Sequence, residues 1–132
     1  KELNSYTDKH PSIVHLGKIE DMYSLLASVD VVVLPSYREG LSKSLVEAAS
    51  MSLPIITTDV PGCVDIVEHE YNGLVCKVKS TESLRLSFEK MINLSAEKRH
   101  QMGLNGRKIV LTKFDEIIVI KHYLNVINSI LN

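Results

Sequence analysis

The sequence predicts an α/β fold in which a parallel β-sheet carries helices on both faces. Short apolar runs such as VVVLPS (31–36) alternate along the chain with longer segments of helical periodicity. Hydrophobic residues make up 45% of the 132 residues and charged residues 23%, a composition that allows a buried core. The length fits one small domain or a part of a larger one.

Strands are expected where apolar or β-branched residues run without interruption. These runs are SIVHLG (12–17), VVVLPS (31–36), PIITTD (54–59) and NGLVCKV (72–78). Continuous apolar runs are typical of parallel strands that are buried on both faces. Ligands of such sheets bind beyond the carboxyl ends of the strands, so the residues that follow position 34 are the first place to look for chemistry.

Helices are expected where apolar residues recur at spacings of three and four. The segments are 20–30, 42–52, 81–94, 95–114 and 115–132, with a loop and a short helix in 60–70. Ser42, Thr81 and Ser95 are the expected N-caps, since each is a hydroxyl residue at the start of a helical run.

The composition also excludes several classes of function. The formal net charge is −1 and no segment holds a run of Lys or Arg, which argues against nucleic-acid binding. No apolar stretch has the length of a membrane span. Cys63 and Cys76 lack CxxC spacing and fit reduced thiols in a cytosolic protein. The histidines show no metal-ligand spacing, so no metal site is expected.

The segment from residue 35 to residue 47 combines a strand end with a helix start. Pro35 ends the strand because it cannot donate to a sheet, and Gly40 permits a tight turn or a close ligand approach. The helix that begins near Ser42 leaves the amides of residues 43–45 unpaired at its positive end. This arrangement predicts an anion site, for which phosphate is the usual occupant.

Two carboxylates flank this anion site. Glu39 lies in the loop before the helix and Glu47 lies about one turn inside it. A carboxylate accepts two hydroxyl donors at once and suits a vicinal diol, so the order of groups matches a sugar nucleotide. In the alternative interpretation, Lys43 and Glu47 form an ordinary i, i+4 pair on a solvated face and Glu39 is a simple loop acid.

Residues 31–75 closely resemble the C-terminal nucleotide-binding domain of retaining glycosyltransferases with the GT-B fold, family 4, in particular the capsule and O-antigen transferases. The resemblance covers residues 12–113. It is carried by Glu47 eight positions after Glu39 and by three motifs, PSYREG (35–40), TDVPGC (58–63) and NGLV (72–75). The chain departs from the family pattern at Ser42, where many members have glycine, and at Asp65, where glutamate is common.

The resemblance implies a role for each matching residue. Glu47 is expected to bind the ribose hydroxyls of the donor, and Glu39, the candidate catalytic residue, to bind the donor sugar. The turn containing Lys18 and Ile19 is expected to lie against the nucleobase. The diphosphate is expected to be held by the backbone amides of Leu41, Ser42, Lys43 and Ser44, and Gly40, also a donor-binding residue, is expected to permit its close approach. The family transfers a sugar with retention, without an assumed covalent nucleophile and without a bound metal, and a UDP-sugar is the expected donor.

The resemblance also implies that the chain is part of a longer protein and that KELNSY (1–6) is the end of the family domain's second helix. The strand at 12–17 would be the third and that at 31–35 the fourth of a 3-2-1-4-5-6 sheet, without a hydrogen bond between them. Residues 1–132 would then be a partial domain, with an α/β part (1–113) and a terminal helix (114–132). A basic pair that grips the diphosphate would belong to the earlier segments.

The expected partners are the N-terminal domain of the same protein, a nucleotide-sugar, and an acceptor glycan or lipid-linked oligosaccharide. The terminal helix, with an apolar stripe, either packs on its own sheet or returns to the N-terminal domain. A cytoplasmic location is expected, and a peripheral position on the inner face of the membrane is open. A non-catalytic nucleotide- or protein-binding module and a sugar-nucleotide epimerase are the alternatives.

Overall fold

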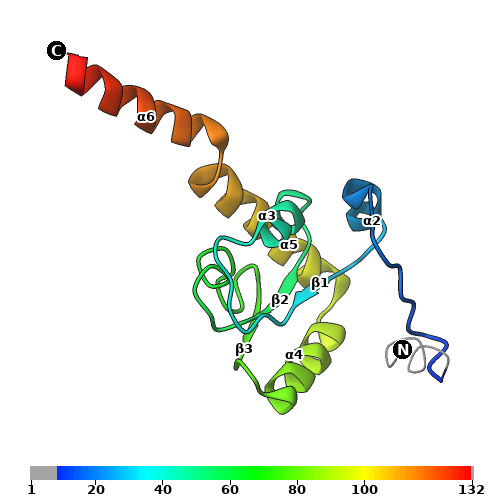
Figure 1. Cartoon of the computed structure of the whole chain (residues 1–132). Coiled ribbons are helices and arrows are strands. Elements are labelled where there is room, and N and C mark those ends of the chain that lie inside the picture. Colours follow the sequence, from blue (N-terminus) through cyan, green and yellow to red (C-terminus); the bar gives the residue numbers. More distant parts are fainter. Residues whose placement is uncertain (1–8, 132) are drawn as a thin grey trace.

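The computed structural model describes residues 9–131, in which three parallel strands form one sheet (Figure 1). The strands are β1 (Val32–Leu34), β2 (Ile55–Thr58) and β3 (Gly73–Cys76), in the order β1-β2-β3. In the register, Val33 is paired with Ile56 and Ile56 with Leu74. The predicted α/β fold with a parallel sheet is confirmed.

Helices lie on both faces of this sheet. The α3 and α5 helices pack against each other on one face, and α4 covers the other face beside β3 (Figure 1). The described helices are α2 (Met22–Ala27), α3 (Lys43–Ser50), α4 (Thr81–Asn93), α5 (Ala96–Lys113) and α6 (Glu116–Leu131).

The core has one layer on each side of β2, whose four residues are all buried. Ile55 packs into the layer formed with α3 and α5, which contains Leu45 and Val110. Ile56 packs into the layer on the α4 side, together with Met91. Because successive side chains of a strand point to opposite faces, one continuous apolar run serves both layers. The carboxyl ends of the strands, where the candidate site lies, are therefore supported by core packing on both faces of the sheet.

The prediction of a strand at 12–17 is wrong. These residues form no strand and do not pair with β1 in the described part of the chain. Ile13, Val14 and Leu16 are exposed. A strand exists only as part of a hydrogen-bonded ladder, and no ladder partner for this segment lies among residues 9–131. The expectation that it does not bond directly to residues 31–35 is confirmed for the described residues.

Two local predictions also need correction. Residues 61–66 form successive turns instead of the expected short helix, since Gly62 has a φ of 81° and interrupts helical geometry. Ser80, not Thr81, caps α4, and its hydroxyl accepts a hydrogen bond from the Ser83 amide. The predicted caps Ser42 and Ser95 are confirmed. The helix end expected in 1–6 lies outside the described residues.

The α6 helix stands apart from the layers, running away from the sheet beyond the end of α5 (Figure 1). None of its described residues is buried, so the alternative in which it packs on its own sheet is not realised in residues 9–131. Its exposed apolar side chains are Ile117, Ile118, Val119, Ile120, Tyr123, Leu124, Val126, Ile127, Ile130 and Leu131. No helix in residues 9–131 combines the length and the apolarity needed to cross a bilayer.

The buried cysteines allow a first test of the core. Burial raises the pKa of the Cys76 thiol, and the nearby charge of Asp59 raises it further. A smaller fraction of thiolate reacts more slowly, so Cys76 should be alkylated by iodoacetamide at pH 8 markedly more slowly in the native chain than in 6 M guanidinium. Mass spectrometry of the labelled peptide measures this rate. Equal rates in the two conditions would contradict the buried position of Cys76.

Candidate functional site

The loop between β1 and α3 holds Glu39 in a defined position. The Ser36 hydroxyl donates a hydrogen bond of 2.8 Å to Glu39 Oε2. The Ser36 carbonyl in turn accepts a 2.5 Å hydrogen bond from the hydroxyl of Thr58, the last residue of β2. Glu39 is therefore tied through Ser36 to the carboxyl end of the central strand, on the edge where α/β sheets bind ligands.

The start of α3 provides the predicted unpaired amides. Ser42 is 2% exposed, its hydroxyl accepts from the Leu45 amide at 3.4 Å, and its carbonyl accepts from the Val46 amide at 3.1 Å. The amides of Lys43 and Ser44 have no acceptor among the described residues. Two N–H groups at the positive end of a helix can therefore bind an anion.

The approach to these amides is open. A side chain added at Gly40 would meet no atom within 4 Å, and Leu41 is exposed. The packing of the described residues therefore does not require glycine at position 40. The space that a Cβ atom at position 40 would occupy is therefore open, in the loop that leads into α3.

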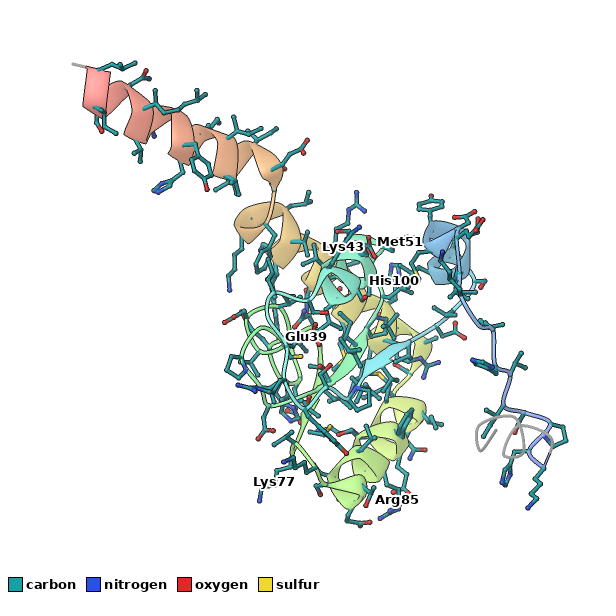
Figure 2. All side chains as sticks on the ribbon, viewed as in Figure 1. Glu39, Lys43, Met51, Lys77, Arg85 and His100 are labelled. Carbon is teal, nitrogen blue, oxygen red and sulfur yellow. The ribbon has the colours of Figure 1, made fainter. Side chains whose placement is uncertain are left out.

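Glu47 lies on the second turn of α3, where Lys43 reaches it. The Lys43 ammonium is 3.5 Å from Glu47 Oε1, with the lysine side chain 89% exposed and the glutamate 38% exposed. The i, i+4 pair of the alternative interpretation is therefore present, and Figure 2 shows Lys43 on α3 and Glu39 in the loop that leads to it. An exposed pair of this kind is weak, so it leaves the Glu47 carboxylate available to a ligand.

A cleft of about 560 Å³ begins at Glu47 and runs between α2 and α3. Its walls are formed by Met22, Tyr23, Leu26, Glu47, Ser50, Met51 and Arg107. Tyr23 is 71% exposed, so a flat ring is available to a ligand in this cleft. The volume lies in the range of small-molecule sites.

The structure brings most, but not all, of the predicted site residues together. Gly40 to Ser44 and Glu47 lie along the loop and the start of α3, with Ser42 buried and the others at least partly exposed. Lys18 and Ile19 lie in the segment before α2 and do not line the cleft. Gly17 has a φ of 66°, which supports the expected turn at this point.

Two supporting contacts were not assigned a role from the sequence. Ser36 and Thr58 fix Glu39, but a serine and a threonine at strand ends carry no spacing signal by themselves. Their signal is positional, because hydroxyl residues at the carboxyl ends of two adjacent parallel strands must lie close together. Among the described residues, no group of three or more His, Cys, Asp or Glu side chains is placed to hold a metal ion.

The N-cap at the centre of the site gives a stability prediction. Ser42→Ala should lower the free energy of unfolding by about 0.5–2 kcal/mol, because the buried hydroxyl caps α3. Ser42→Gly should lower it by only about 0.3 kcal/mol, because glycine is tolerated at an N-cap. Urea denaturation of the three proteins measures the difference. Equal losses for the two variants would show that the hydroxyl does not act as a cap.

The comparison with known proteins assigns the chain to a family. Residues 6–109, most of the chain, match the family of glycosyl transferases group 1. The chain belongs to this family. The capsular polysaccharide biosynthesis glycosyltransferase CapM of Staphylococcus aureus is 29% identical over 126 residues, which are 96% of this chain and 33% of that protein.

Another relative acts, by its name, on a lipid-linked sugar. It is the N,N'-diacetylbacillosaminyl-diphospho-undecaprenol alpha-1,3-N-acetylgalactosaminyltransferase of Campylobacter jejuni, 31% identical over 122 residues. The match covers 91% of this chain and 31% of that protein. The chain therefore spans about a third of the length of these relatives.

The fold of this glycosyltransferase family member recurs in solved structures. The crystal structure of Anabaena Alr3699/HepE in complex with UDP matches with a TM-score of 0.87 and 22% sequence identity. The match covers 97% of this chain and 36% of that one. This likeness shows the Rossmann-like arrangement of a GT-B glycosyltransferase domain.

Proposed function

We propose that the chain is the donor-binding part of a retaining glycosyltransferase of family 4. It binds a nucleotide-sugar, taken to be a UDP-sugar, whose sugar moves to an acceptor hydroxyl in the assembly of a surface polysaccharide. The observation that carries the proposal is the start of α3. There the unpaired amides of Lys43 and Ser44 lie between Glu39 and Glu47.

In this proposal each group takes the part of the donor that its chemistry suits. The α3 amides, with the backbone of Leu41 and Ser42, hold the diphosphate, and Gly40 leaves the approach to them open. Glu47 accepts the ribose hydroxyls, and the cleft beside it receives the nucleoside. Glu39 accepts hydrogen bonds from hydroxyls of the sugar. Lys18 and Ile19 are assigned to the nucleobase from the family resemblance alone, since neither residue lines the cleft beside Glu47. A carboxylate on each side of a phosphate site matches the order of sugar, diphosphate and ribose.

The reaction needs no side chain as a nucleophile. The bond between the anomeric carbon and the phosphate oxygen breaks as the acceptor oxygen attacks from the same face, and the acceptor proton passes to the departing diphosphate. Negative charge develops on the phosphate, so helix-start amides stabilise the transition state more than the ground state. The diphosphate is held by protein groups in this account, and no metal ion is assigned to it.

The full reaction needs parts of the protein outside these 132 residues. The relatives are about three times as long, and we propose that the additional N-terminal part binds the acceptor and receives α6. The name of the Campylobacter relative supports a lipid-linked acceptor. The free, buried Cys63 and Cys76 support a cytoplasmic location.

A UDP titration of the full-length protein tests the donor site. Glu47→Ala should weaken UDP binding at least about tenfold, because a hydrogen bond to a charged group contributes about 1.5–3 kcal/mol. Isothermal titration calorimetry measures the dissociation constants. Glu89→Ala is the matched control, since it removes an exposed glutamate from an i, i+4 pair on α4, away from the site.

The titration also separates the proposal from its alternative. Unchanged UDP affinity in Glu47→Ala would remove Glu47 from the ribose site. If the full-length protein binds UDP but transfers sugar from no UDP-sugar to any lipid-diphosphate acceptor, the non-catalytic binding module would be the correct interpretation.

A further inference from the structure

The turn at residues 60–65 lies directly against the loop that carries Glu39. Gly62 is buried, and a Cβ atom built on it would lie 1.7 Å from the Gly40 carbonyl oxygen and 3.0 Å from that of Glu39. Real Cβ atoms do not approach backbone oxygens this closely, so only glycine allows the two segments to touch as they do. The φ of 81° at Gly62 adds a second reason for glycine.

Asp65 holds this turn in place. Its Oδ2 atom accepts a hydrogen bond of 3.1 Å from the Gly62 amide. The side chain thereby fixes the peptide that faces Gly40, while Val60 and Cys63 on either side of Gly62 are buried in the core. The turn is therefore anchored at both ends and by its own carboxylate.

The contact is one-sided. Gly40 meets the Gly62 turn on its inner side, whereas the outer side is free of any atom that an added side chain would touch. The Gly62 turn thus limits how far the Glu39–Gly40 peptide can move inward. Ser36 sets the direction of the Glu39 carboxylate, and the Gly62 turn sets the position of its backbone.

We propose that Gly62 and Asp65 are positioning residues for sugar transfer, which act by placing the Glu39–Gly40 peptide at the distance that the donor sugar requires. The proposal rests on the assignment of Glu39 to the donor sugar made above. Neither residue touches the donor. Catalysis is sensitive to such placement, since an error of about 1 Å in the position of a group that holds the substrate can cost about 10²-fold in rate.

Gly62→Ala in the full-length protein is the direct test. The added methyl group pushes the Glu39–Gly40 peptide outward, so kcat with the UDP-sugar should fall about 10²-fold. The dissociation constant of UDP should change less than about threefold, because UDP lacks the sugar that Glu39 holds and 1.4 kcal/mol would be needed for a tenfold change. General damage to the domain would lower both quantities together.

Gly103→Ala is the matched control for the packing defect. A Cβ atom at Gly103 would lie 1.8 Å from the Ser52 carbonyl oxygen, a clash of nearly the same severity at the opposite end of α3. This variant should lose stability, yet the folded fraction should keep the wild-type kcat. Equal loss of kcat in the Gly62 and Gly103 variants would overturn the proposal, as would a wild-type kcat in folded Gly62→Ala.

A second pair of variants serves if Gly62→Ala does not fold. Asp65→Asn keeps an oxygen that accepts from the Gly62 amide and should retain most of kcat, whereas Asp65→Ala should lower kcat with little change in UDP affinity. Equal kcat in these two variants would contradict the role of Asp65. Absence of transfer by the wild-type protein itself would contradict the proposed function, and is thereby distinguished from failure of this inference.

Discussion

Glu39→Gln in the full-length protein should lower kcat for sugar transfer by about 10²-fold or more, because it removes a charged acceptor that holds the sugar at the reacting centre. Glutamine has the same shape, and its amide oxygen can still accept the hydrogen bond from Ser36. The loop therefore keeps its geometry, and the change in rate reports the loss of charge. Initial rates of UDP release at saturating donor measure it.

Two further measurements make this result specific to the sugar. The affinity for UDP should stay within about threefold of the wild type, since the proposal assigns the nucleotide to α3 and Glu47. Glu68→Gln, which changes an exposed glutamate paired with Lys113 on another part of the domain, should leave the rate unchanged. A wild-type rate in Glu39→Gln would leave Glu39 as an ordinary loop acid.

The isolated 132-residue chain should transfer no sugar above background under conditions in which the full-length protein is active. The amides at the start of α3 could contact a diphosphate from one side only, and Glu39 does not line the cleft beside Glu47. A transfer site must exclude water from the sugar, or hydrolysis competes with transfer. Radiolabelled product formation at equal molar concentrations gives the comparison.

A folding control accompanies that experiment. Far-UV circular dichroism and UDP titration of the isolated chain establish whether the sheet and the α3 site are formed. Transfer of sugar by the isolated chain would show that all catalytic groups lie within these 132 residues, and the proposed need for an additional N-terminal part would then be wrong.

The parts of the fold that depend on local sequence were predictable. Uninterrupted apolar runs marked β1, β2 and β3, and hydroxyl residues marked the caps Ser42 and Ser95. The run at 12–17 had the same apolar character but forms no strand, because a strand also requires a neighbour that composition does not reveal. The position of Ser80 as the cap of α4 differs from the prediction by one residue, the usual uncertainty at helix ends.

The site was predictable to the extent that it follows the chain. Gly40 to Ser44 and Glu47 are close in sequence and lie together on the loop and the start of α3. The supports of Glu39 come from elsewhere, with Thr58 at the end of β2 and Gly62 in the turn that follows. Contacts between segments about 20 residues apart depend on sheet order and on the path of a loop. Neither is encoded in the spacing of the residues concerned.

The exposed α6 helix has a mechanical consequence. Its 16 residues form a rod of about 24 Å, and only two residues separate it from α5. A rotation of about 10° at this junction would displace the far end of such a rod by about 4 Å. A domain bound to α6 would then rotate with this helix about the junction near Phe114. In the proposed function that domain is the N-terminal part of the protein, so the angle at this junction would set its orientation relative to the donor-binding part.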